Sequence, residues 1–535
     1  MSEFLLFTAL IQSYLSAFFV QSSGRLHTAR FARLHEYIRI CVSKRTLFKK
    51  MPVILIGLAP FNRFFAVLPT KTQKELANVI LLGKTRVGKG LNITTNLLTW
   101  GFPVVVNDIK GELWDQTSGW RERGLNGRAF IFDPRGAGHK FDPFEGRTTD
   151  LDLRSAATIL LYRPHEGQNA AFTERAITML TQIFHAAKLV GERTLPFTYE
   201  ILNQGLYGTS SMLKTISDKH NWYPNLATKF LDTEYEKADF DNEFLQDCFS
   251  TMTTRINNIL TKETVRCFTG CDFTGANIIT SGTSPISLYL CWPERDLLTL
   301  GPLIELVWDC LINDMVNTYD ALKGEGCTRT LLVLDEIFRS GMKKLPEYAT
   351  TVCGRNISIL LSAQSRSQLD AEYGFHKANV LRGQMDTIII HRPAPDDYET
   401  QAHIERLLGS TSGFAHSTSE HGGEVTTTGE SEQKIPLIPA HETELIEETQ
   451  VIIKRSGIRP ILAGRLDWRR LPELEERRTM PPPQVPALPD FEKRLTGRDD
   501  PLAAAASWQL SPELTRRGSP IYAGNGFAGR SREAA

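Results

Sequence analysis

The chain has 535 residues, 41% of them hydrophobic, and its 61 basic residues balance its 61 acidic residues. This length exceeds one ordinary hydrophobic core, so we expect about two or three domains. The neutral balance excludes an argument from overall charge for a nucleic-acid partner, which would have to rest on local basic patches. The cysteines are scattered without the spacing of zinc ligands, which is typical of free thiols in a reducing compartment.

The chain begins with an apolar segment at residues 4–20, and basic residues follow it between Arg25 and Lys50. The segment is slightly shorter than the roughly 20 residues that a membrane-spanning helix needs. Basic residues beside an apolar segment mark the cytoplasmic side of a membrane, as next to a single anchor or to an interfacial helix on anionic lipid. The pattern fits equally an amphipathic helix packed on the protein itself. In the next apolar stretch, residues 53–68, Pro60 favours two short strands over a membrane helix.

A glycine-rich loop follows the apolar run at residues 79–82 and precedes a helical segment at residues 91–100. The loop consists of Gly83, Lys84, Thr85, Arg86, Val87, Gly88, Lys89 and Gly90. Strand, loop and helix in this order predict a phosphate-binding loop, in which backbone N–H groups and the helix N-terminus face the phosphates. Lys89, as an exposed loop cation, would reach the β- and γ-phosphates. Gly90 departs from the motif, because Ser or Thr at this position supplies a hydroxyl to Mg²⁺. The alternative is a glycine turn that holds no nucleotide.

A second motif lies at residues 328–336, a buried-strand run that ends in Asp335 and Glu336. An Asp at the carboxyl end of a central strand can hold Mg²⁺, directly or through water. The adjacent Glu can orient and deprotonate an attacking water. The alternative is a capping pair without chemistry, and the presence of a glycine-lysine loop in the same chain weighs against it.

Further apolar runs predict the other strands of a mainly parallel sheet. They lie at residues 103–108, 129–134, 286–291, 356–364 and 386–391. Between about residues 151 and 261 the strand signals stop and helical periodicity replaces them, as at 170–187 and 243–260. We therefore expect an α/β fold in which a helical domain interrupts the sheet.

The last third of the chain predicts a helix at 396–408, a mobile Gly/Ser/Thr-rich loop at 409–434 and two strands at 451–454 and 459–462. From Pro481 the sequence is proline-rich and indicates a disordered tail. The expected division is an amino-terminal segment at 1–50, a nucleotide-binding domain in two parts at 51–150 and 266–478, a helical domain at 151–265, and a tail at 479–535.

Together these motifs resemble the type IV coupling proteins, the TraG/TraD group of conjugative-transfer and secretion ATPases. The resemblance rests on the loop 85–90, the strand end 108–112, the Leu334-Asp335-Glu336 strand, Gln364 in Ala363-Gln364-Ser365, and the closing Arg459-Pro460-Ile461 strand. It covers roughly residues 53–468, and family members often carry Gly where Gly90 stands. The resemblance implies a RecA-like P-loop NTPase with a mainly parallel central sheet and an inserted all-helical domain.

The resemblance also implies ATP and Mg²⁺ as cofactors, a homohexamer, and a place at the bacterial inner membrane with the ATPase domain on the cytoplasmic face. The expected partners are relaxase-bound single-stranded DNA or protein effectors, which the family hands to a type IV secretion channel. The family usually has two amino-terminal membrane helices, whereas this sequence offers at most the one candidate at residues 4–20.

Residue by residue, the resemblance assigns phosphate contact to Lys89 and the loop through Leu91, Mg²⁺ to Asp335, water activation to Glu336 and γ-phosphate sensing to Gln364. Arg355 resembles an arginine proposed to reach the nucleotide of the next subunit, where it would stabilise charge on the transferred phosphoryl group. The alternative for Arg355 is a surface turn residue, because only its position supports the role.

Two other functions stay open at the level of sequence. One is a hexameric DNA pump of the FtsK/HerA kind, without secretion. The other is a nucleotide-gated docking platform that recruits substrate and hydrolyses ATP feebly. The set of Lys89, Asp335 and Glu336 favours turnover over docking, whereas Gly90 keeps the docking function open.

Overall fold

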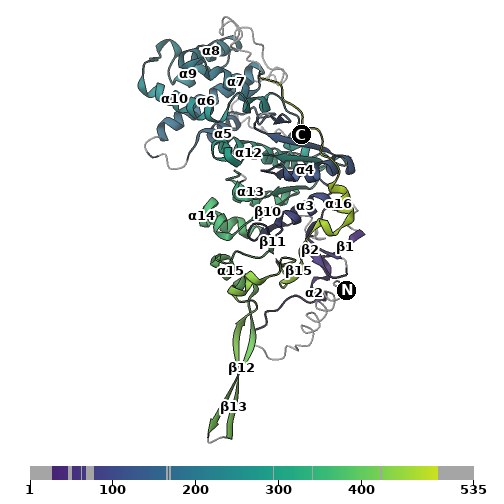
Figure 1. The fold of residues 1–535 in the computed structure, drawn as a ribbon. Coiled ribbons are helices and arrows are strands. Elements are labelled where there is room, and N and C mark those ends of the chain that lie inside the picture. The colour runs from purple at the N-terminus through teal and green to yellow at the C-terminus, as the bar shows by residue number, and fades with distance from the viewer. Residues whose placement is uncertain are drawn as a thin grey trace, which may run out of the picture.

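The computed structural model describes residues 27–45, 51–61, 63–67, 77–135, 137–163, 167, 170–292, 294–339, 341–421 and 424–491. A helical domain forms one end of the molecule, a large sheet the middle, and a thin two-stranded ribbon the opposite end (Figure 1). The apolar segment expected at residues 4–20 lies outside the described residues. None of the helices that are described is both long and apolar enough to cross a bilayer.

The sheet in the middle has 13 strands within the described part of the chain, and its centre is parallel. The parallel strands, in spatial order, are β11 (Met385–Ile390), β4 (Asn78–Leu82), β10 (Ile357–Ala363), β9 (Thr330–Leu334), β5 (Val104–Asn107), β8 (Ile286–Leu290) and β6 (Arg128–Asp133). Antiparallel strands extend both edges: β7 (Ala137–Gly138) beside β6, and β14 (Gln450–Arg455), β15 (Ile461–Gly464), β2 (Ile54–Ala59), β3 (Arg63–Val67) and β1 (Cys41–Ser43) beyond β11. The predicted mainly parallel α/β sheet is confirmed.

The central strands are buried on both faces, as continuous apolar runs predict. In β4, Val79 and Leu81 pack in one core while Ile80 and Leu82 pack in the other, because successive side chains of a strand point to opposite faces. The first core lies under α3 (Lys89–Thr99) and α4 (Glu112–Gly119), and α16 (Pro472–Arg478) packs on both helices. The second core lies under α12 (Leu297–Ala321), α13 (Leu345–Thr351) and α14 (Arg366–Gly383), and α11 (Gly275–Ile279) packs on α12.

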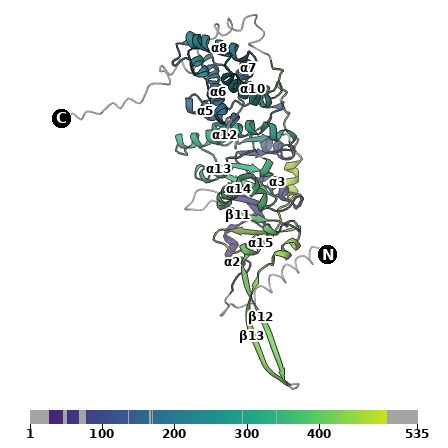
Figure 2. The same ribbon diagram turned by 90° about the vertical axis from the view of Figure 1, so that its left-hand side faces the viewer.

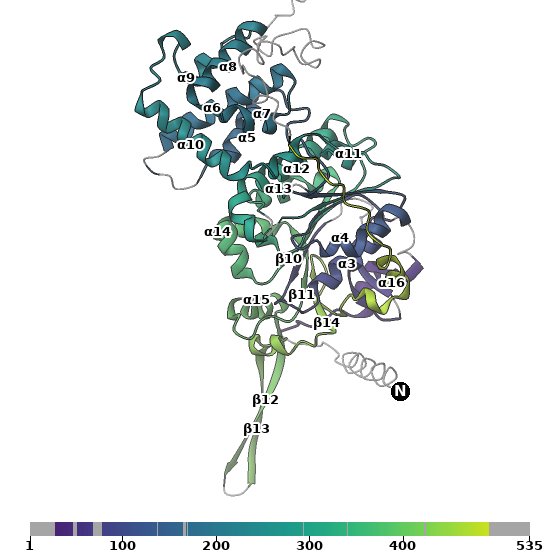
Figure 3. The same cartoon turned by 45° about the horizontal axis from the view of Figure 1, so that its top comes forward.

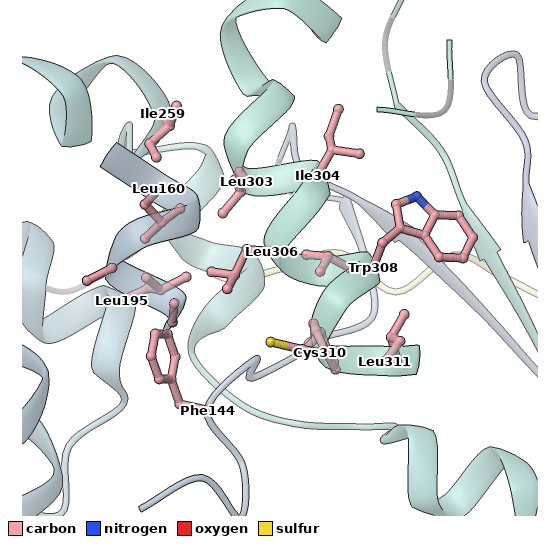
Figure 4. Close-up of a cluster of buried hydrophobic side chains, with 14 of the residues drawn as sticks. Phe144, Leu160, Leu195, Ile259, Leu303, Ile304, Leu306, Trp308, Cys310 and Leu311 are labelled. Atoms are coloured by element: carbon pink, nitrogen blue, oxygen red, sulfur yellow. The ribbon is translucent and has the colours of Figure 1, made fainter. Parts of the chain in front are cut away.

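The helical domain is built, in its described part, from the α-helices that lie between β7 and α11. They are α5 (Asp150–Leu161), α6 (Ala170–Val190), α7 (Thr194–Leu202), α8 (Gly205–His220), α9 (Leu226–Leu231) and α10 (Glu243–Ile259). Leu160 of α5, Ile259 of α10 and Leu303 of α12 gather where this domain meets the sheet layer (Figure 4). The inserted domain expected at 151–265 therefore shares one continuous hydrophobic core with the second face of the sheet.

The stretch at 409–434, expected to be a mobile loop, is instead a long antiparallel ribbon. Strands β12 (Ser410–His421) and β13 (Glu424–Pro436) follow α15 (Tyr398–Leu408) and pair along their whole length (Figure 2). The prediction was wrong because it took the Gly, Ser and Thr content of the stretch as the sign of a loop. The stretch also holds Val425 and a run of threonines, which favour a pleated backbone, and cross-strand pairing satisfies the backbone groups.

Both ends of the sheet domain extend beyond their expected limits. Of the amino-terminal segment expected at 1–50, α2 (Leu34–Tyr37) packs on the sheet and β1 pairs with β3, so the sheet begins at Cys41. The carboxyl-terminal tail expected from residue 479 runs along the body as far as residue 491. There the Gly138 N–H donates to the Pro486 carbonyl at 3.2 Å, and Arg266 pairs with Asp490 at 3.0 Å.

One buried arginine joins three elements of the nucleotide-binding domain. The Arg121 side chain is fully buried, and its Nε donates to the Ser287 hydroxyl of β8 at 2.6 Å. Its guanidinium also donates to the carbonyls of Leu97, Trp100 and Phe102, at the end of α3 and in the turn before β5. Burial lowers the pKa of Arg121 to about 10. The cation therefore holds α3, the helix that follows the glycine loop, in a fixed position on the sheet.

We expect Arg121→Leu to lower the free energy of unfolding by about 3 kcal/mol or more, because it leaves buried carbonyls without donors. Urea unfolding followed by circular dichroism measures this loss. Arg154→Leu, which removes an exposed arginine of α5, is the matched control and should unfold near the parent's midpoint. Equal midpoints for the two variants would show that Arg121 is not a structural tie.

Candidate nucleotide site

The glycine loop connects β4 to α3 at the carboxyl edge of the parallel strands. Gly83 has φ +151, and a Cβ there would lie 2.6 Å from the Cβ of His391. Gly88 has φ +94 and directly precedes α3. Only glycine adopts these backbone angles freely, so the loop folds tightly and leaves the first N–H groups of α3 without helical partners. This is the geometry that a phosphate-binding loop requires.

The Lys89 side chain folds back over the loop. Its ammonium donates to the Gly83 carbonyl at 2.5 Å and to the Lys84 carbonyl at 2.8 Å. Lys89 is only 9% exposed, so the expectation of an exposed loop cation is wrong. Burial lowers the pKa of Lys89 to about 8, and the negative charges of Asp335 and Glu336 act in the opposite direction. The lysine is therefore a desolvated cation that faces two carboxylates.

Asp335 and Glu336 directly follow β9. Burial raises the pKa of Asp335, and the neighbouring Glu336 raises it further, whereas Lys89 and the Ser362 hydroxyl lower it. Glu336 adopts φ +51 and lies 3.9 Å from the Lys110 ammonium. A non-glycine residue with positive φ is uncommon in a protein, and such strain clusters at functional sites.

Gln364 lies between the loop and the two carboxylates, because β10 separates β4 from β9 in the sheet. Ala363 is in register with Leu82 of β4, so Gln364 and Gly83 leave the sheet side by side. The Gln364 side-chain oxygen accepts from the Gln368 amide at 3.1 Å, which orients it from α14. The structure thus brings Lys89, Gln364, Asp335 and Glu336 to one edge of three adjacent strands.

Arg355 does not join this group within one subunit. It precedes β10, at the amino edge of the sheet, about 25 Å of strand away from Gln364. Its Nε contacts Asp320 at 2.9 Å, and its side chain is 31% exposed. A contact between Arg355 and a nucleotide would therefore have to involve another copy of the chain.

Two residues for which the sequence predicted no role lie against the glycine loop. Arg465, directly after β15, donates to the Val87 carbonyl at 3.0 Å, and a Cβ on Gly88 would lie 2.8 Å from its side chain. His391, directly after β11, is buried beneath Gly83, and burial followed by the charges of Lys89 and Arg465 lowers its pKa to about 3. The only sequence signal was their common place, a polar residue directly after a strand of the sheet.

A further polar residue at this edge has a structural role. Asp108, which follows β5, accepts from the Trp114 N–H at 2.6 Å and so caps α4. Burial raises the pKa of Asp108 to about 6. The neighbouring Asn107 amide donates to the backbone carbonyl of Asp335 at 3.1 Å, which fixes the chain directly before Glu336.

The residues present fit ATP and Mg²⁺. The loop and the start of α3 offer N–H donors and a lysine to the phosphates. Asp335 offers a carboxylate oxygen, the ligand type that Mg²⁺ prefers. A Cβ on Gly90 meets no atom within 4 Å, so the missing hydroxyl leaves open space rather than another group.

This fold and this site define a RecA-like P-loop ATPase, in which one strand separates the loop strand from the strand of the acidic pair. The chain belongs to the family described as type IV secretory system conjugative DNA transfer, whose model matches residues 59–489.

The comparisons with individual proteins agree with this family. The chain is 23% identical over 452 residues to a conjugal transfer protein TraG of Escherichia coli, which covers 76% of this chain and 69% of that protein. It is 26% identical over 449 residues to protein VirD4 of Rhizobium radiobacter, a match that covers 78% of this chain and 62% of VirD4. The chain thus spans less than two thirds of VirD4. The structure of the bacterial conjugative coupling protein TrwBdeltaN70 in complex with sulphate is similar in fold, with a TM-score of 0.56, 16% identity, and 88% of this chain and 99% of that chain covered.

We expect Gly90→Ser to fit without strain and to raise the affinity of the ATP-bound protein for Mg²⁺ several-fold, because it adds the hydroxyl ligand that the motif normally contains. Titration calorimetry with Mg²⁺ in the presence of a non-hydrolysable ATP analogue measures this affinity. Gly90→Ala is the matched control, since it adds the Cβ without the hydroxyl. Equal Mg²⁺ affinities for the two variants would rule out metal coordination from position 90.

Proposed function

We propose that this protein is an ATP-hydrolysing coupling protein that recruits relaxase-bound single-stranded DNA or protein effectors and drives them into a type IV secretion channel. The observation that carries the proposal is the convergence of Lys89, Gln364, Asp335 and Glu336 at one edge of three adjacent strands. Solved structures of TrwB are described in complex with the ATP analogue ADPNP and with ADP and Mg²⁺, which supports the same cofactors here.

Each residue of the site has a distinct proposed role. Lys89 exchanges its bonds to the Gly83 and Lys84 carbonyls for the β- and γ-phosphate oxygens. Asp335 would hold Mg²⁺, directly or through water, and the ion would supply positive charge beside the phosphates. Glu336 orients the attacking water and accepts its proton. Gln364 lies where it can contact the γ-phosphate, and its bond to α14 offers a way to pass the state of the nucleotide to that helix.

The active assembly is proposed to be a homohexamer with shared sites. Arg355 lies at the sheet edge opposite the glycine loop, so it can serve only the nucleotide of a neighbouring subunit. Its bond to Asp320 is exposed and therefore weak, which leaves the guanidinium free to exchange this partner for a phosphate. An arginine that reaches the nucleotide of a neighbouring subunit, called an arginine finger, stabilises charge on the transferred phosphoryl group.

The place of the protein is proposed to be the cytoplasmic face of the bacterial inner membrane. The apolar segment at residues 4–20 with the basic residues that follow supplies the contact, as an anchor or as an interfacial helix. Because β1 begins at Cys41 and pairs with β3, removing the chain up to residue 50 would also remove a strand of the sheet.

Gly90 supports one competing function, a docking platform with weak hydrolysis, because the loop lacks the hydroxyl that normally binds Mg²⁺. Measuring the ATPase rate of the full chain with and without single-stranded DNA separates the two functions. A coupling motor should hydrolyse ATP faster when DNA is present, whereas a docking platform should show a slow rate that DNA does not change. Stimulation by duplex DNA alone would favour a DNA pump of the FtsK/HerA kind.

Lys89→Ala should abolish ATP binding, whereas Glu336→Gln should retain ATP binding and block hydrolysis, because the amide keeps the shape but accepts no proton. Equilibrium binding of a fluorescent ATP analogue and a phosphate-release assay measure the two properties. Lys262→Ala is the control for Lys89, because it removes an exposed lysine of the helical domain, outside the loop. ATP turnover at the parent's rate in Lys89→Ala, or loss of ATP binding in Glu336→Gln, would contradict the assigned roles.

Arg355→Ala should bind ATP normally but turn over more slowly, by a factor on the order of a thousand for a true finger. Asp320→Ala is the matched control, because it breaks the same ion pair and keeps the arginine. Specific activity of the parent should rise with protein concentration as subunits associate. Mixing Arg355→Ala with Lys89→Ala subunits should restore part of the activity at interfaces that retain both residues. Concentration-independent activity, with Arg355→Ala behaving like the parent, would exclude a shared site.

A further inference from the structure

A basic cavity of about 1000 Å³ lies at the base of the ribbon, remote from the nucleotide site. Its walls come from residues 27–30, the end of α15, the start of β12, the end of β13, and the turn between β14 and β15. Figure 3 shows α15 beside the base of the ribbon. The charged lining residues are Arg30, Arg406, Lys434, Lys454, Arg459 and a single carboxylate, Glu405. The cavity therefore carries a strong excess of positive charge although the chain as a whole is neutral.

Two of these cations help to build the wall. Arg30 forms a bidentate pair with Glu36, at 2.7 and 3.0 Å, and Arg459 donates to the Thr28 carbonyl at 2.8 Å. The Ala29 N–H donates to the Ser410 carbonyl at 3.1 Å, and Thr28 forms an isolated β-bridge with Thr411 of β12. These bonds fix the shape of the cavity before any ligand arrives.

The other three cations, Arg406, Lys434 and Lys454, also line the cavity, where Glu405 is the one carboxylate among the lining residues. Within the described part of the chain these three cations form no ion pair; Arg406 donates to the Ala402 carbonyl at 3.3 Å and Lys454 to the Ile458 carbonyl at 3.5 Å. The Glu405 carboxylate accepts from the Ala440 N–H at 2.7 Å and offsets only one of the positive charges. Three unpaired cations around one hollow repel each other, and a multivalent anion relieves this repulsion. The chemistry of the cavity is therefore that of a phosphate receptor.

The position of the cavity in the chain distinguishes between the possible phosphates. Only residues 21–26 separate the apolar segment from His27 in the cavity wall, and seven extended chain steps span at most about 25 Å. Whatever surface the apolar segment occupies therefore lies within about 25 Å of the cavity. The lining also contains no Phe, Tyr or Trp, the side chains on which bases of single-stranded nucleic acid stack.

We propose that this cavity binds the phosphate headgroup of an anionic phospholipid and so orients the ATPase domain on the membrane surface. The inference rests on the membrane contact proposed above and adds the site that makes the contact selective for lipid charge. Arg406, Lys434 and Lys454 supply the contacts to the headgroup, and the pair of Arg30 with Glu36 keeps the wall in place. Clusters of basic residues next to a membrane segment are a general means of anionic-lipid recognition.

The test measures sedimentation of the full chain with two kinds of vesicle, pure phosphatidylcholine and phosphatidylcholine with about 30% phosphatidylglycerol. The cavity variant combines Arg406→Glu, Lys434→Glu and Lys454→Glu. The control variant combines Lys219→Glu, Lys262→Glu and Lys323→Glu, exposed lysines remote from the cavity, and so carries the same change of net charge. A milder set, Arg406→Gln, Lys434→Gln and Lys454→Gln, replaces the first if the reversed charges prevent folding. ATP binding and thermal unfolding check that each variant is folded.

The parent and the control should bind the anionic vesicles at least about tenfold more tightly than the cavity variant, and added salt should reduce this difference. All three should bind neutral vesicles alike through the apolar segment. Equal binding of parent and cavity variant to anionic vesicles would overturn the cavity assignment and leave the membrane contact intact. Failure of the parent to bind either vesicle would overturn the membrane contact itself. A cavity variant that loses single-stranded DNA binding but keeps vesicle binding would assign the cavity to nucleic acid and overturn the inference.

Discussion

The parallel register of three strands is the constraint on which the nucleotide site depends. Ala363 pairs with Leu82, so β4 and β10 end at the same level, and Leu361 pairs with Leu334, so β9 ends two residues earlier along β10 and Asp335 and Glu336 follow beside its last residues. Their carboxyl ends then deliver the glycine loop, Gln364 and the acidic pair to one edge. A slip of one residue in β10 would turn its whole apolar set to the other face, because side chains alternate along a strand. The two hydrophobic cores that enclose the sheet therefore also set the positions of the polar residues at its edge.

Opposite charges at the site stabilise each other against burial. Burial lowers the pKa of Lys89 and raises the pKa of Asp335, which favours the neutral form of each. The charge of each residue shifts the pKa of the other in the opposite direction and so favours the charged forms. Removing one partner would leave the other as an uncompensated charge near the core. The lysine is meanwhile satisfied by two loop carbonyls, so it is already in place when a nucleotide enters. Placement before binding reduces the entropy that would otherwise be lost when the phosphates are bound.

The molecule separates its functions along its length (Figure 1). The helical domain lies at one end and the basic cavity and ribbon at the other, with the nucleotide site between them. The helical domain and the sheet share one hydrophobic core through α12. A movement of α12 would therefore change the packing of both the helical domain and the sheet. Arg465, at the carboxyl end of β15, donates to the Val87 carbonyl of the loop, whereas the turn between β14 and β15, at the other end of β15, lines the cavity. Strand β15 thus extends from the glycine loop of the nucleotide site to the wall of the basic cavity.

The sequence by itself determined the class of the protein and the chemistry of its site. The apolar runs before Gly83 and Asp335 made both strands recognisable, because buried parallel strands need continuous hydrophobic stretches and the motifs follow them directly. Local patterns of this kind need no knowledge of distant contacts. The prediction of a mobile loop at residues 409–434 was wrong, because this stretch has little hydrophobic pattern and its two strands are held by backbone pairing rather than by burial.

Only the tertiary structure decided which distant residues complete the site and which do not. Arg465 reaches the loop from 378 positions away, and Arg355 stays at the far edge of the sheet although it lies only a few residues before Gln364 in the chain. The burial of Lys89 and the shape of the basic cavity likewise arise from segments that no local pattern connects. The physical reason is that strand order places residues by crossover connections, so separation along the chain says little about separation in space.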